Sequence, residues 1–113
     1  MKDTIRLRMQ NAIKEIIEEI PKGEIFDSHY VINKLISDYS DVYLLFASEL
    51  INSQKTTKKL DITAYVHSQI SKKIGTKRLS GLVTRVKLDG KKTEFRSGNI
   101  RGNATECAGW RRK

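Results

Sequence analysis

The sequence predicts one α+β domain, in which a mainly helical first two-thirds is followed by a small antiparallel β-hairpin or three-stranded sheet. Three observations support this prediction. A length of 113 residues suits a single domain spanning residues 1–113. Apolar side chains recur at helical spacing within residues 4–74 and at alternate positions over residues 82–88. An Asp-Gly pair, the strongest short-range signal for a hairpin, follows at 89–90 within a β region of 82–111.

The first helix is expected over residues 4–20, with Asp3 or Thr4 as its N-cap. At 100° per residue its isoleucines gather on one face, as in a helix that packs on a core. The Pro-Lys-Gly segment at 21–23 then ends the helix, because proline cannot donate to the helical ladder and glycine tolerates the turn. Residues 24–26 are short, apolar and compatible with a strand.

Asp27 or Ser28 is expected to cap a second helix of about three turns. A third helix follows over residues 42–51 and is apolar nearly all round. Such a helix is either deeply buried or shared with a partner, and full burial is difficult in so small a domain. The pattern therefore predicts a homodimer contact through Val42–Ile51.

The fourth helix is expected over residues 62–74, with Asp61 as its N-cap and a glycine after its last turn. Its isoleucines and valine recur every fourth position and form a stripe that packs inward. The opposite arc carries the small polar side chains of Ser68 and Ser71 beside Lys72. Small side chains let a helix approach the edges of bases closely, so this arc is a candidate reading surface.

After the fourth helix the period of the pattern changes from helix to strand. Residues 82–88 alternate, and residues 93–96 are expected to return as the second strand of the hairpin. A turn at 101–103 leads to a last strand over 104–110. Trp110 is expected to anchor that strand against the helices, and the alternative is a stacking platform for a single-stranded base.

The positive charge is concentrated at the C-terminal end of the chain. Residues 1–71 contain nine Lys/Arg and ten Asp/Glu, whereas residues 72–113 contain thirteen Lys/Arg and three Asp/Glu. Folding does not require this asymmetry, because like charges repel in the compact state. A basic end on a neutral body predicts a polyanionic partner, most often nucleic acid, and the alternative is a well-solvated surface.

The order of these elements is helix, short strand, three helices and a hairpin rich in Lys and Arg. It resembles that of a winged helix-turn-helix domain with one extra apolar helix at residues 41–51. The resemblance covers most of the chain and depends on element order and charge rather than on a signature motif. It implies that helix 62–74 enters the major groove of DNA and that the basic hairpin touches the backbone or the minor groove. The chain departs from the family where a turn of about 3–4 residues normally joins the helix pair, because the third helix and a polar loop intervene.

The expected nucleic-acid contacts combine base readers with phosphate ligands. Gln69 has an amide that suits adenine, and the Lys and Arg residues of the helix end and hairpin would meet phosphates. Alternatively, these cations complement the helix dipole or protect an exposed strand edge. If about six of them met phosphates, log K would fall with log salt at a slope of roughly −5. The predicted nucleic-acid-binding residues are Ser68, Gln69, Ser71, Lys72, Lys73, Lys77, Arg78, Arg85, Lys87, Lys91, Lys92, Arg96 and Arg101.

These features predict a non-catalytic protein that binds duplex DNA, acting as a transcriptional regulator. We expect no catalytic residue, metal or cofactor, because the sequence has no HExxH, CxxC or glycine-rich phosphate loop, and His29 is expected to be exposed. The single cysteine, Cys107, and the lack of an apolar run of ~20 residues favour the cytoplasm and no membrane partner. Two alternatives stay open: a protein-interaction adaptor that uses the apolar helix 41–51, and an RNA-binding module that uses the sheet.

Overall fold

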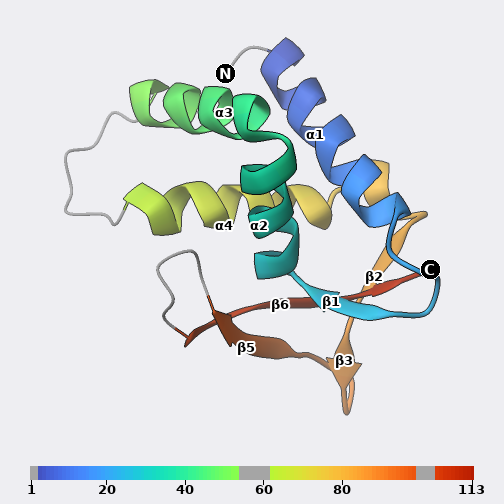
Figure 1. The fold of residues 1–113 in the computed structure, drawn as a ribbon. Coiled ribbons are helices and arrows are strands. Elements are labelled where there is room, and N and C mark those ends of the chain that lie inside the picture. The colour runs from blue at the N-terminus through green and yellow to red at the C-terminus, as the bar shows by residue number, and fades with distance from the viewer. Residues whose placement is uncertain (1–2, 54–61, 99–103) are drawn as a thin grey trace.

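The computed structural model describes residues 3–53, 62–98 and 104–113 and confirms the α+β class (Figure 1). The helices are α1 (Asp3–Glu18), α2 (Ser28–Asp38), α3 (Ser40–Ser53) and α4 (Ile62–Ile74), followed by the short 3-10 helix η1 (Lys77–Leu79). The strands are β1 (Ile25–Asp27), β2 (Val83–Arg85), β3 (Lys87–Leu88), β4 (Lys91–Lys92), β5 (Glu94–Gly98) and β6 (Ala104–Arg112). Within the described ranges, no helix is both long enough and apolar enough to cross a bilayer.

The first two helices begin where local sequence signals place them. Helix α1 begins at Asp3 and ends at Glu18 rather than at residue 20. Asp27 is the N-cap of α2, and its side chain accepts a hydrogen bond from Tyr30 N at 2.8 Å, which satisfies one free donor of the first turn. At the other end of α2, the hydroxyl of Tyr39 donates to Glu15 Oε2 at 2.7 Å and so joins α2 to α1. This hydrogen bond raises the pKa of Tyr39 to about 12. The N-cap expected at Asp61 lies outside the described residues.

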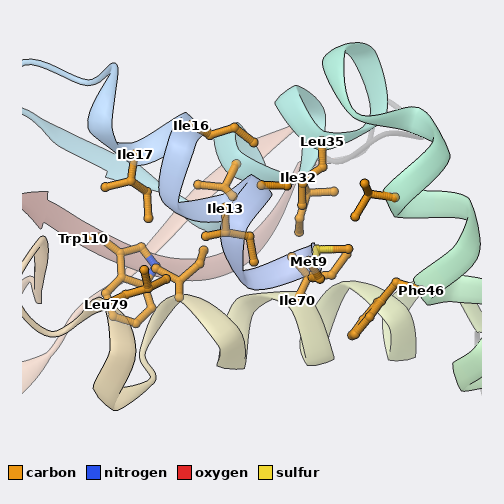
Figure 2. Packing of buried hydrophobic residues seen from close by; sticks show 14 of the residues in the cluster. Met9, Ile13, Ile16, Ile17, Ile32, Leu35, Phe46, Ile70, Leu79 and Trp110 are labelled. Carbon is orange, nitrogen blue, oxygen red and sulfur yellow. The ribbon is translucent and has the colours of Figure 1, made fainter. Parts of the chain in front are cut away.

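The core lies between α1, the other helices and the sheet. Figure 2 shows Met9 and Ile13 of α1 against Ile70 of α4, with Phe46 toward one end of the cluster and Trp110 toward the other. Each of these side chains is at most 7% exposed. Burial of a large apolar side chain contributes roughly 1.5–3 kcal/mol, so this cluster holds the helices on the sheet.

Helix α3 has two apolar faces with different surroundings. Val42, Phe46 and Leu50 are buried and recur every fourth residue, so this stripe completes the core of the same chain. Leu44 and Ile51 are 64% and 45% exposed on the other side. The helix is therefore only partly buried, which explains why its sequence is apolar nearly all round.

Strand β6 is the centre of the main sheet. It has β1 on one side and β2 on the other, and its first half pairs with β5. All of these pairings are antiparallel. Val86 N donates to Gly109 O at 3.0 Å, between the stretch of β6 that pairs with β2 and the stretch that pairs with β5. Strands β2 and β5 therefore follow one another along the same side of β6.

Between β2 and β5 the chain leaves the sheet as a two-stranded ribbon, β3–β4 (Figure 1). Thr93 N donates to Val86 O at 2.9 Å and closes the ribbon at its base. At its tip Asp89 and Gly90 have φ values of 54° and 78°. Positive φ at both central residues is what a type I′ turn requires, so the predicted turn is confirmed.

The prediction of one continuous strand over 82–88, paired with residues 93–96, is wrong. The strand breaks at Val86, where the chain passes from the main sheet into the ribbon. Strand β5 pairs with β6 instead. Alternation cannot reveal this difference, because a strand within a sheet and a ribbon that leaves it share the same period of two.

Gly109 allows β5 and β6 to pack closely. A β-carbon at position 109 would stand 2.5 Å from Cε1 of Phe95, so any larger residue would force the ring to move. This close approach gives a physical reason for a glycine within the longest strand.

Candidate nucleic-acid interface

Helix α4 presents a narrow exposed stripe made of Ala64, Ser68 and Lys72. These residues are four apart, so they lie above one another on one helical face. The opposite face, which includes Val66 and Ile70, is buried in the core. The structure therefore leaves small side chains and a lysine accessible along α4, as the sequence predicts for Ser68 and Lys72.

The prediction that Ser71 belongs to this exposed arc is wrong. Its Oγ lies 2.7 Å from Oγ of Ser28, which accepts a hydrogen bond from Trp110 Nε1 at 3.0 Å. Oγ of Ser28 also lies 3.4 Å from the carbonyl oxygen of Ala108 and donates to it. Ser71 thus satisfies buried polar groups where α2, α4 and β6 meet.

The remaining predicted residues of α4 and of the turn after it point in several directions. Gln69 and Lys73 are half-buried, and burial lowers the pKa of Lys73 beside an arginine of α1. Arg78 Nη1 donates to Gln10 Oε1 of α1 at 3.2 Å, while Lys77 is exposed. Lys73 and Arg78 therefore lie on the α1 side of α4.

The β3–β4 ribbon carries three exposed lysines, Lys87, Lys91 and Lys92. Lys87 is directly opposite Lys92, so both side chains lie on the same face of the ribbon. Like charges in opposite positions destabilise a strand pair, and Asp89 is the only carboxylate in residues 87–92. A bound anion would relieve this repulsion, and protection of an exposed strand is the alternative use of such lysines.

Arg85 is held in place by two neighbours. It forms an ion pair with Glu94, and its guanidinium carbon lies 5.3 Å from the ring centroid of Trp110 in a cation–π arrangement. Its buried Nε has no hydrogen-bond partner among the described residues. A buried donor without a partner costs about 1–3 kcal/mol. The ion pair and the cation–π contact therefore fix the guanidinium beside Trp110.

A groove of about 300 Å³ lies between the end of α4, β2 and the ribbon. Three cations line it, Arg85 from β2, Lys92 from β4 and Lys113 from the residue after β6. Nζ of Lys113 is held by a hydrogen bond to the carbonyl oxygen of Ser80 at 2.7 Å. Lys113 is not among the residues predicted from the sequence, because only the register of β6 reveals where it lies.

The other predicted cations lie apart from this groove. Arg96 is exposed on β5 and is opposite Glu106 of β6, which offsets its charge. Arg101, like the predicted turn at 101–103, lies outside the described residues. Of the predicted cations that the structure describes, Arg85 and Lys92 therefore line the groove, Lys87 and Lys91 lie on the ribbon, and Lys73 and Arg78 lie toward α1.

A second polar cluster lies at the start of α2. Nδ1 of His29 is 2.7 Å from Oγ of Ser97, which is 3.7 Å from Sγ of Cys107. His29 is only 8% exposed, so the prediction of an exposed histidine is wrong. Burial raises the pKa of the Cys107 thiol, which is therefore neutral near pH 7 and weakly nucleophilic. Over the described ranges, no group of three or more His, Cys, Asp or Glu residues could hold a metal ion.

Comparisons with known proteins give no match: no protein-family model and no curated protein matches the sequence, and no solved structure matches the fold.

Proposed function

We propose that this chain is a non-catalytic domain that binds duplex DNA in the manner of a winged-helix protein and acts as a transcriptional regulator. In this proposal α4 lies in the major groove and the β3–β4 ribbon contacts the backbone or the minor groove. The observation that carries the proposal is the convergence of Arg85, Lys92 and Lys113 where the end of α4 meets the ribbon. The expected cytoplasmic location stays a prediction.

The shape and chemistry of α4 support this role. Its 13 residues correspond to a length of about 20 Å, and a single helix fits a major groove ≈ 12 Å wide. Helix α3 packs against the core through its buried stripe and leaves Ser68 and Lys72 of α4 exposed. The inserted helix therefore does not cover the face that would read base edges.

The side chains of the β3–β4 ribbon and of α4 suit them to different contacts with DNA. The exposed lysines of the ribbon suit phosphates, which set affinity and orientation without reading sequence. The small side chains of the α4 stripe allow the helix to come near base edges, where sequence is read. Trp110 is 7% exposed, so most of its ring is packed inside the protein, whereas the RNA-binding alternative requires exposed rings on the sheet on which bases can stack.

The test is fluorescence anisotropy with a labelled duplex over a series of salt concentrations. Six cations lie on the ribbon, in the groove or on the exposed α4 stripe: Lys72, Arg85, Lys87, Lys91, Lys92 and Lys113. If they meet phosphates, log K should fall with log salt at a slope of about −5. Binding that is absent, or that does not change with salt, would contradict the proposal.

A second function, self-association through α3, is favoured by one specific observation. Leu44, Leu45 and Ile51 are 64%, 37% and 45% exposed on the side of α3 that faces away from the core. Several large apolar side chains exposed on one surface helix favour a protein-interaction site. A homodimer would also suit DNA binding, because two-fold proteins read two half-sites.

Sedimentation velocity tests this second function. We expect a dimer at micromolar concentration and a monomer after Leu44→Lys with Ile51→Lys. Both positions are exposed, so the double variant should keep the far-ultraviolet circular dichroism spectrum of the parent chain. A parent chain that is monomeric at every concentration would exclude self-association through this face.

A further inference from the structure

The groove between α4 and the ribbon has a chemistry that phosphate contacts alone do not explain. Its lining combines the cations Arg85, Lys92 and Lys113 with apolar side chains, among them Val83 and Trp110. A site for the bare backbone of DNA needs only charge, because the backbone presents phosphates and sugars. A groove with both cations and an apolar lining fits a ligand that has an anionic part and an apolar part.

The size of the groove narrows the class of ligand. About 300 Å³ is at the lower end of the range of small-molecule sites. A single phosphate ion would leave most of it empty. The hydroxyl of Thr84 also lines the groove and can donate to a phosphate or sugar oxygen. The hydroxyls of Thr76 and Ser80 line it too, but they already donate to the carbonyl oxygens of Lys73 and Lys77.

We propose that this groove binds one nucleotide unit, with its phosphate on the cations and its base or sugar against the apolar lining. The nucleotide could be free, or it could be an unpaired nucleotide of a nucleic-acid strand, since the chemistry is the same. This inference rests on the proposed function, because the ribbon that would lie along a strand also supplies Lys92.

Arg85 is the residue best prepared for the phosphate. Glu94 and the Trp110 ring fix its guanidinium, so little side-chain freedom is lost when a ligand binds. Glu94 offsets one positive charge, so Lys92 and Lys113 are needed to keep the groove attractive to an anion.

Trp110 is the only tryptophan of the chain and lines the groove, so its fluorescence reports on occupancy. The experiment titrates the full chain with thymidine monophosphate, thymidine, inorganic phosphate and single-stranded oligothymidylate. We expect thymidine monophosphate to change the Trp110 emission with an affinity about tenfold or more above that of phosphate or thymidine. A response to the single strand but not to the mononucleotide would also support the site and would identify the strand as the source.

Two results would overturn the inference. Equal affinity for inorganic phosphate and for thymidine monophosphate would show a simple anion site, and no change of emission with any probe would show that the groove binds none of them. Thr84→Glu places a carboxylate in the groove at an exposed position and should weaken nucleotide binding about tenfold or more. Asn33→Glu, at an exposed position on α2, is the control with the same change of charge.

Duplex binding is measured on the same samples, which separates the two proposals. If the chain binds the nucleotide but no duplex, the groove site is supported and the proposed function is contradicted. If the chain binds duplex with the expected salt dependence but the Trp110 emission does not change, the proposed function is supported and the groove site is contradicted.

Discussion

Reversing the charge of the ribbon by Lys87→Glu with Lys91→Glu is expected to weaken duplex binding by about fiftyfold or more at ~0.1 M salt. Each phosphate that a cation neutralises adds about 0.9 to the slope of log K against log salt. Removing two such cations therefore flattens the slope by about 2, which corresponds to roughly fiftyfold between ~1 M and ~0.1 M salt. Repulsion between the new carboxylates and phosphates can only add to this effect. The measurement is fluorescence anisotropy over a salt series.

The design separates binding from folding. Lys87 is opposite Lys92, so a glutamate at position 87 turns a like-charge pair into an opposite-charge pair and stabilises the ribbon. Lys14→Glu with Lys34→Glu makes the same change of net charge on α1 and α2, away from the ribbon. If both double variants lose affinity equally, the effect comes from net charge alone and the ribbon is not the contact surface.

The positions of the helices and the turn at the tip of the ribbon could be predicted because the sequence signals for them are local. The N-cap at Asp27, the boundaries of α4 and the type I′ turn at Asp89 and Gly90 each depend on a few neighbouring residues. The split of residues 82–88 into β2 and β3 depends on pairing with β6, more than twenty residues further along the chain. Alternation carries no information about which strand is the partner.

The exposure of the candidate residues was predicted correctly where it follows from helical period or from a turn, as for Ser68, Lys72 and the ribbon lysines. Ser71 was placed on the wrong side because it lies at the margin of the buried face, where the small Ser28 of α2 lets α4 come close enough for a hydrogen bond. His29 was expected to be exposed because the first turn of a helix often is, but β5 and β6 cover it. Lys113 reaches the groove only through the register of β6. These errors share one cause, which is contact between residues far apart in sequence.

Trp110 joins the sheet, the helices and the groove, and its loss is expected to have the largest effect on stability. Its side chain is 7% exposed, its Nε1 donates to Ser28, and Arg85 lies over its ring. Replacement of a buried Trp or Phe by Ala typically costs about 3–5 kcal/mol, and a domain of this size has a total stability of about 5–15 kcal/mol. We therefore expect Trp110→Ala to lower the free energy of unfolding by roughly 3–5 kcal/mol. The measurement is urea denaturation followed by circular dichroism, because the variant has no tryptophan to report.

Two further variants assign this loss to its causes. Trp110→Phe keeps an aromatic ring in the core but removes the donor to Ser28, so it should cost roughly 1–3 kcal/mol. Leu44→Ala removes an apolar side chain that is 64% exposed, and it should change stability by less than about 0.5 kcal/mol. A Trp110→Ala variant as stable as Leu44→Ala would show that the ring does not hold β6 against α2 and α4. In that case the pairing of β2 with β6 around this ring would not explain the position of Arg85 and Lys113 in the groove.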